Sequence, residues 1–360
     1  MFINDIIGQR LITQRLLGLV QENRLPHALL LWGNEGVGKL PIALYLAQYL
    51  LCMNRNEGQP CGECLSCKQI HKWIHPDLHF VFPIVKNSTE PKCDDFMEEW
   101  RERLLKSPYF SYQEWMEQIG EGKQGQIYAS ESEEIIRKLN FKSFQGENKV
   151  MIIWLPEKMN VVCANKLLKL IEEPPEKTFF IMVSEHPEWL LSTISSRTQM
   201  VHIPAIDSAD LAPIVGADIA RVANGNYVKA RTMQQQAGSS LKYFEWYRTL
   251  MLSVVMINLP QLKSWVEQVN EGGREEIKNF LQYAQHITRE CFVMHIGNPQ
   301  LNYLEVHEQQ FAPKFVKYLT VDNIEFVVNT FTKAYTDIEQ NGNGKIVLFD
   351  TGLQLMTKIK

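Results

Sequence analysis

The sequence predicts an α/β domain built around a phosphate-binding loop and followed by regions made of helices alone. This prediction rests on three observations. A glycine-rich loop, Gly33–Leu40, lies between a short apolar strand and an apolar helix. Four cysteines follow that helix with the spacing C-x8-C-x2-C-x2-C. From about Asp207 to Lys360 the apolar residues recur at helical spacing, with no further phosphate loop or cluster of metal ligands.

Length and composition set the broad class. A chain of 360 residues is expected to form two or three domains. Hydrophobic residues make up 45% and charged residues 22%, as in ordinary globular proteins, and the net charge of -4 gives no overall basic footprint for nucleic acid. The sequence shows no signal peptide and no apolar run of about 20 residues, so we expect a cytoplasmic protein without a membrane partner.

The stretch GNEGVGKL follows the phosphate-loop pattern except at its last position. HALLLW before it predicts a buried strand, and PIALYLAQYLL after it predicts a helix with Pro41 in the first turn. The loop keeps an anion cradle of backbone N–H groups together with a lysine, and its candidate residues are Gly33, Gly36, Gly38 and Lys39. Leu40 replaces the hydroxyl residue that would hold Mg²⁺.

The second half of such a site is an apolar strand that ends in carboxylates. The stretch Lys149–Asn160 provides the strand, but Trp154 and Leu155 stand where the carboxylates are expected. Glu157 follows after a proline. An alternative strand, Phe179–Glu188, carries Glu185, and both carboxylates stay open as substitutes.

Four cysteines form a candidate metal site: Cys52, Cys61, Cys64 and Cys67. Four thiolates at this spacing can enclose Zn²⁺ in a tetrahedron without an open position, which indicates a structural rather than a catalytic metal. The other three cysteines, Cys93, Cys163 and Cys291, stand alone and are interpreted as ordinary thiols. The nearby histidines are interpreted as packing or capping residues: His71, His75 and His79.

Several motifs resemble one known family. ANKLLKLIEEPPEKTFFIMVSEHPEWLLSTISSRTQ, residues 164–199, closely resembles the clamp-loader ATPases of bacterial DNA replication, which are AAA+ proteins. The opening FINDIIGQRLITQRL, the segment RLPHALLLWG, the cysteine spacing and HPDLHFV are similar to the same proteins. Together these motifs cover most of the first 200 residues in the family's order.

The resemblance implies an AAA+ (RecA-like) domain over 1–205 that carries the zinc module at 52–67 and an insertion at about 87–128. It further implies a small helical lid over 206–236 and a helical collar domain for assembly over 237–360. For the insertion, the stripe Phe96, Trp100 and Leu104 predicts one added helix. NGNGK resembles the turn before the last collar helix.

The resemblance also implies a subunit that has stopped hydrolysing nucleotide. Its register places Trp154 and Leu155 on the family's Asp-Glu pair, and GNYVKAR resembles the family's second sensor, with Val228 where the ATPases have an arginine. In SSRT, Ser196 and Arg197 match the family's Ser-Arg-Cys motif, in which the arginine serves ATP bound at a neighbouring subunit. Implied partners are the gamma or tau and delta subunits and, through the assembly, the sliding clamp and primed DNA.

Two other functions stay open at this point. One is an active ATPase like the gamma or tau subunits, with Lys39 and a recruited Glu157 or Glu185. The other is a zinc-dependent nucleic-acid-binding module, although the acidic balance and the lack of interleaved basic and aromatic residues speak against it. ATP binding by the altered loop is not decided by the sequence.

Overall fold

The computed structural model describes residues 5–55, 59–86, 88–120, 124–296, 304, 306–340 and 342–359. The chain divides into two compact units, Met1–Arg231 and Thr232–Lys360. Each unit has a hydrophobic core of its own. Within the described residues no helix is both long and apolar enough to cross a bilayer.

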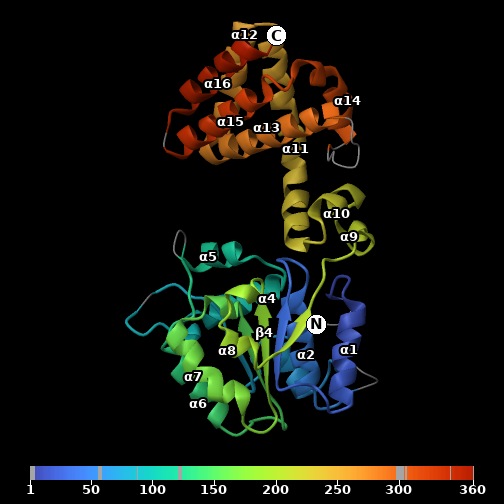
Figure 1. Ribbon diagram of the computed structural model, residues 1–360, viewed down its shortest axis with the longest axis vertical. Coiled ribbons are helices and arrows are strands. Elements are labelled where there is room, and N and C mark those ends of the chain that lie inside the picture. The colour runs from blue at the N-terminus through green and yellow to red at the C-terminus, as the bar shows by residue number, and fades with distance from the viewer. Residues whose placement is uncertain are drawn as a thin grey trace. The chain divides into compact units, whose positions relative to one another are not determined.

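The first unit is built on a five-stranded parallel sheet with the order β2-β3-β4-β1-β5. Its strands are β1 (Ala28–Trp32), β2 (Leu78–Val81), β3 (Lys149–Trp154), β4 (Thr178–Ser184) and β5 (Gln199–His202). The inner strands are apolar along most of their length because both faces of the sheet are covered. The parallel α/β sheet expected from the sequence is therefore confirmed (Figure 1).

Helices cover both faces of this sheet. The chain moves from β1 toward β2 in one direction and from β3 through β4 to β5 in the other, so right-handed crossovers place the connecting helices on opposite faces. The helix α2 (Lys39–Leu51) packs against β3, β4 and α1 (Arg10–Gln21), and every one of its residues is buried. The helix α7 (Val161–Glu172) packs against α6 (Glu131–Asn140) and the short α8 (Ser192–Ser195).

The cysteine segment and the insertion add further helices. They are α3 (Leu65–Ile70), the 3-10 turn η2 (Cys93–Phe96), α4 (Met97–Lys106) and α5 (Tyr112–Gly120). The expectation of one added helix is wrong, because α5 forms as well and buries Trp115 and Met116. The stripe Phe96, Trp100 and Leu104 is buried, as the spacing predicts.

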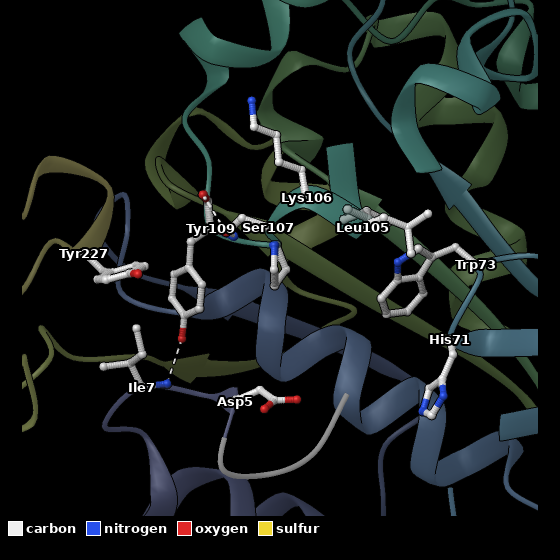
Figure 2. A pocket seen from close by; sticks show the side chains of 11 residues that line it. Asp5, Ile7, His71, Trp73, Leu105, Lys106, Ser107, Tyr109 and Tyr227 are labelled. Atoms are coloured by element: carbon white, nitrogen blue, oxygen red, sulfur yellow. Dashed lines mark hydrogen bonds between the residues drawn. The ribbon is translucent and has the colours of Figure 1, made fainter. Parts of the chain in front are cut away.

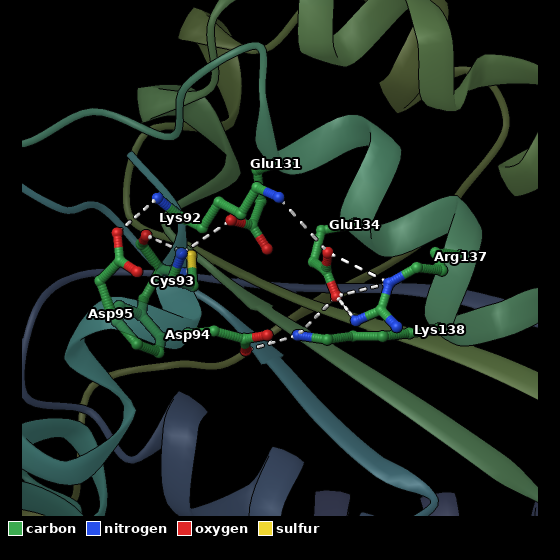
Figure 3. Close-up of polar contacts among 9 residues, drawn as sticks. Lys92, Cys93, Asp94, Asp95, Glu131, Glu134, Arg137 and Lys138 are labelled. Atoms are coloured by element: carbon green, nitrogen blue, oxygen red, sulfur yellow. Dashed lines mark hydrogen bonds and ion pairs between the residues drawn. The ribbon is translucent and has the colours of Figure 1, made fainter. Parts of the chain in front are cut away.

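Polar contacts fasten the start of the insertion to α6 (Figure 3). The backbone N–H of Cys93 donates to the Glu131 carboxylate at 2.8 Å, and the Lys138 ammonium lies 2.6 Å from the Asp94 carboxylate. Glu131 is nearly inaccessible, and burial raises its pKa despite the hydrogen bond from Cys93. The insertion is thus part of the folded unit rather than a loosely attached loop.

Two short helices complete the first unit: α9 (Ser208–Val215) and α10 (Ala217–Ala223). Together with the start of α11 (Tyr227–Val255) they form a small core that includes Leu211, Val215 and Val228. We call residues 206–231 the lid. The boundary between the two units falls inside α11, which runs on without a break through residue 236.

In the part of the second unit that the structure describes, all regular elements are helices. After α11 it contains α12 (Leu259–Glu271), α13 (Gly273–Ile296), α14 (Val306–Phe315), the 3-10 turn η6 (Val316–Tyr318), α15 (Ile324–Glu339) and α16 (Gly344–Lys358). Apolar residues of α11 and α16 are buried in one core with residues of α13 and α15, as the helical spacing of apolar residues predicts. Asn343 caps α16 by accepting hydrogen bonds from the N–H groups of Lys345 and Ile346.

Candidate functional site: a phosphate-type loop, a surface arginine and a cysteine cluster

The glycine-rich loop joins the carboxyl end of β1 to α2, the position in which a phosphate loop works. Gly36 and Gly38 have φ values of 72° and 94°, a region that disfavours other residues. Leu40, in place of the metal-binding hydroxyl residue, is buried with an exposed fraction of 5%. The loop thus has two glycines in the left-handed region, and a buried leucine follows its lysine.

Lys39 is turned inward rather than toward an open cleft. Its side chain is buried, and its ammonium donates to the backbone carbonyl of Asn34 within the loop itself. Burial lowers its pKa, and the charges of Glu185, Glu157 and Glu35 act in the opposite direction. The lysine thus lies near carboxylates whose charges favour its protonated form.

The space over the loop is nearly filled. The cavity there has a volume of about 20 Å³ and is lined by side chains from the loop, the sheet, the insertion and the lid, among them Tyr109, Phe110, Trp154, Glu185 and Val228. A pocket for a small-molecule ligand usually measures about 300–1,000 Å³. The remaining volume suits about one water molecule, so the cavity over the loop is much smaller than a usual small-molecule pocket in this arrangement of the chain.

A larger cavity of about 370 Å³ lies beside this one (Figure 2). Pro108 and Tyr109 line both cavities. The Tyr109 hydroxyl accepts a hydrogen bond of 2.8 Å from the backbone N–H of Ile7, as the dashed line in Figure 2 shows. Ser107 lines only the larger cavity, and Phe110 lines only the smaller one.

The end of β3 carries apolar residues, as the sequence register predicts. Trp154 is the last residue of β3, and its ring packs against those of Trp100 and Phe110 at centroid distances of 5.4 and 5.1 Å. Leu155 is buried and adopts φ 54°, a conformation that costs a non-glycine residue about 1–3 kcal/mol. An aromatic cluster thus occupies the place of the expected carboxylates.

Both substitute carboxylates lie near Lys39, but one of them already has a structural role. Glu157 accepts hydrogen bonds from the backbone N–H groups of Glu185 and His186, at 2.8 and 3.1 Å. Burial raises the pKa of Glu185, and the charge of Lys39 opposes this shift. Glu157 therefore holds the end of β4, while Glu185 faces the small cavity.

The lid contacts the loop through residues 225–231, the segment that resembles the second sensor. Tyr227 donates its backbone N–H to the carbonyl of Gly36 at 3.1 Å, and a Cβ on Gly36 would lie 1.9 Å from Oδ1 of Asn226. Val228 is buried in the lid core and lines the small cavity. Arg231 does not reach the loop glycines but binds the insertion, as described below.

Arg197 lies on the surface at the end of α8. Its Nε donates to the Glu172 carboxylate at 2.9 Å, and a second guanidinium nitrogen donates to the carbonyl of Thr193 at 3.1 Å. About a third of its side chain is exposed, and the hydroxyl of the exposed Ser196 also donates to Thr193. Two hydrogen bonds, to the Glu172 carboxylate and to the carbonyl of Thr193, thus hold the guanidinium at the surface.

The four predicted cysteines converge in space. Their sulfur atoms lie within 4.8 Å of one another. The sulfur of Cys52 lies 3.5 Å from that of Cys61 and 4.0 Å from that of Cys64, and the sulfur of Cys61 lies 3.9 Å from that of Cys67. Tetrahedral Zn²⁺ with Zn–S bonds of about 2.3 Å requires sulfur atoms about 3.8 Å apart. Backbone N–H groups of Cys64 and Glu63 lower the pKa of Cys61 to about 6, whereas burial raises the pKa values of Cys52 and Cys67. The donor set therefore fits a structural zinc ion: Cys52, Cys61, Cys64 and Cys67.

Among the residues that the structure describes, no histidine and no further cysteine belongs to this group. Cys93, Cys163 and Cys291 are buried free thiols. His71 Nε2 lies 3.3 Å from the amide nitrogen of Gln48, and His75 Nδ1 accepts a hydrogen bond from the N–H of Asp77. These histidines support the structure near the cysteine cluster rather than joining it.

Sequence reasoning missed the residues that fill and close the cleft. Tyr109, Phe110 and Glu114 lie in the insertion, for which the sequence suggested no function. Glu114 lies in the first turn of α5, where acidic residues are common, but its partner Arg231 is 117 residues away in the sequence. Such a contact has no periodic signature in the sequence.

Comparisons with known proteins identify relatives of the first unit. The model of the family described as "DNA polymerase III, delta subunit" matches residues 8–207. The chain is 29% identical to DNA polymerase III subunit delta' of Bacillus subtilis over 188 residues, which are 52% of this chain and 45% of that protein. It is 28% identical to subunit tau/gamma of Haemophilus influenzae over 207 residues, 58% of this chain and 24% of that protein.

A longer match extends into the second unit. The chain is 21% identical to subunit delta' of Escherichia coli K12 over 297 residues, 81% of this chain and 78% of that protein. The matches to the Bacillus and Haemophilus proteins span less than half of those relatives. A solved structure of a gamma subunit-related protein of Thermotoga maritima aligns with 97% of this chain and 99% of its own, with 14% identity and a TM-score of 0.38.

Proposed function

The chain belongs to the DNA polymerase III delta subunit family, with delta' subunits among its relatives, and we propose that it is a clamp-loader subunit that does not hydrolyse ATP. The observation that carries this proposal is the small volume of the cavity over the phosphate-type loop. Tyr109, Phe110 and Trp154 leave a cavity of about 20 Å³ over the glycines, and Leu40 offers no hydroxyl for Mg²⁺.

The chain then contributes to hydrolysis through Arg197. Its guanidinium is at the surface, so a neighbouring subunit can bring a bound nucleotide to it. A cation placed beside a transferring phosphoryl group neutralises charge that develops in the transition state, an effect of about 10³ to 10⁵ in rate in other phosphoryl-transfer proteins. In this proposal Arg197 acts as an arginine finger in trans, and Ser196 belongs to the turn that presents it.

The proposed partners follow from the relatives, which are named as delta', tau and gamma subunits of DNA polymerase III. We propose that the chain assembles with gamma or tau and delta subunits, and acts with the sliding clamp and primed DNA through that assembly. A zinc ion on the cysteine cluster would cross-link the end of α2 to α3 and take no part in the reaction.

A second candidate function is that of an active ATPase like the tau/gamma relatives. The proximity of Glu185 and Lys39 favours it, because both groups belong to the chemistry of hydrolysis. It requires the aromatic side chains over the loop to leave and a metal ligand to be recruited. The two functions differ in whether the isolated chain turns over ATP.

The test is reconstitution with the partner subunits, followed by measurement of DNA-stimulated ATP hydrolysis with wild-type chain, Arg197→Ala or no chain. Arg24→Ala is the matched control, since Arg24 is also an exposed arginine with a carboxylate partner. We expect the Arg197→Ala chain to assemble normally. The assembly should then lose the part of its ATP hydrolysis that comes from the one ATP site beside Arg197. Equal turnover with Arg197→Ala and Arg24→Ala would overturn the finger role.

A further inference from the structure

The insertion places two adjacent aromatic residues into two different cores. Tyr109 is buried in the small core of the lid, with its ring 4.9 Å from that of Tyr227. Phe110 is buried in the core of the sheet, 5.6 Å from Trp100. The short connection between α4 and α5 therefore links the lid to the sheet directly above the phosphate-type loop.

A charged contact accompanies this packing. Arg231 of the lid donates to the backbone carbonyl of Tyr109 at 2.8 Å and to the carboxylate of Glu114 at 2.7 Å. The same carboxylate lies 3.0 Å from the guanidinium of Arg103. The exposed fractions of the Arg231, Glu114 and Arg103 side chains are 19%, 31% and 10%, so water screens this pair less than a surface ion pair.

The two arginines stabilise the ionised form of Glu114. Burial alone would raise its pKa, but the N–H of Ser111 and the charges of Arg231 and Arg103 bring the pKa below its ordinary value. The carboxylate is therefore ionised near neutral pH. It offers the lid an anion at the edge of a cleft whose loop, in a nucleotide-binding protein, would hold one.

We propose that residues 107–114 are an internal ligand of this cleft, which hold the lid closed in place of a bound nucleotide. Tyr109 and Phe110 fill the volume over the loop, and Glu114 supplies the negative charge that Arg231 binds. Lid closure then requires no ATP and does not vary with the nucleotide state. This inference rests on the proposed non-hydrolysing function and adds a role for the insertion.

The test is a double-mutant cycle on the full chain, with hydrogen exchange of lid residues 208–231 as the readout. Glu114→Gln keeps the size of the side chain, and Glu117→Gln is the control, because Glu117 is exposed on the same helix. We expect Glu114→Gln and Arg231→Gln each to speed lid exchange about tenfold, equivalent to about 1.4 kcal/mol, and the double variant to add little more. Exchange rates that simply multiply, or that stay at the control value, would overturn the proposal.

A second measurement uses Mg·ATP as the probe. Wild-type lid exchange should be unchanged by Mg·ATP, because the internal segment occupies the cleft. Slower lid exchange of the wild-type chain with Mg·ATP would also overturn the proposal. These readouts concern the isolated chain, whereas the function of Arg197 is read from the assembly, so each can fail while the other succeeds.

Discussion

The hydroxyl oxygen of Tyr109 lies 3.3 Å from the position that a Cβ would take on Gly38, the residue of the phosphate-type loop that precedes α2. A residue of the insertion thus packs closely against the loop at Gly38. The contact joins the loop to the lid core, to which Tyr109 also belongs. This packing is consistent with the proposed function, in which the chain acts on nucleotide bound by a neighbouring subunit.

The aromatic residue at the end of β3 is expected to stabilise the first unit strongly. Trp154 is 3% exposed and contacts Trp100 and Phe110, so Trp154→Ala should lower the free energy of unfolding by about 3–5 kcal/mol. Trp189 is 61% exposed, and Trp189→Ala should change it by about 0.5 kcal/mol or less. Chemical denaturation followed by circular dichroism compares the two. Equal losses would show that the cluster does not hold the cleft together.

Glu172 is expected to compete with the partner's phosphate for Arg197. A partly exposed ion pair of this kind contributes about 0.2–1 kcal/mol. Glu172→Gln should therefore tighten binding to ATP-loaded partner subunits by up to about fivefold, with Glu173→Gln, its exposed neighbour, as the control. Titration calorimetry or fluorescence anisotropy gives the dissociation constants. Weaker binding with Glu172→Gln would mean that the carboxylate orients Arg197 instead.

The cysteine cluster should hold about one zinc ion per purified chain. Cys64→Ser removes a ligand and should lose the metal and lower the melting temperature of the first unit. Cys163→Ala changes a buried cysteine outside the cluster and should retain the metal. Elemental analysis and thermal melting measure both effects. A metal content that does not differ between the two variants would rule out the four-cysteine site.

The half-buried His79 should make stability depend on pH. Burial, assisted by the charge of Lys138, lowers its pKa from 6.5 to about 4. As the pH falls, the unfolded chain therefore binds a proton at His79 before the folded chain does. The contribution of neutral His79 to the free energy of unfolding is fully present above pH 6.5 and is lost as the pH falls toward 4, with a slope of up to about 1.4 kcal/mol per pH unit.

In His79→Gln, the free energy of unfolding should lose this dependence on pH between 6.5 and 4. His27→Gln, at an exposed histidine, controls for the loss of an imidazole. Denaturant unfolding at several pH values provides the slopes. A wild-type slope that survives in His79→Gln would assign the effect to another group.

Local patterns in the sequence predict much of this fold. The order of strand, loop and helix around Gly33–Leu40, the apolar β3, and α7 with its stop before Pro174 follow from apolar spacing and turn residues. The cysteine spacing likewise predicts the cluster that the structure brings together. Each of these features depends on residues that are close in the chain.

The closure of the cleft could not be predicted in the same way. Arg231 contacts Tyr109 across 122 residues of sequence, and neither residue lies in a recognisable motif for that contact. The pair between Arg197 and Glu172 joins two halves of one motif, but sequence spacing does not state which carboxylate the arginine faces. Tertiary packing decides both, because it brings together elements with independent local preferences.

Binding and turnover of Mg·ATP by the isolated chain test the central claim most directly. Radiolabelled ATP should show no saturable binding and no hydrolysis up to about 1 mM, the upper range of ordinary KM values. Lys39→Met should behave like the wild type, since the ammonium already binds the loop carbonyl of Asn34. Saturable, magnesium-dependent binding with turnover that Lys39→Met abolishes would contradict the claim.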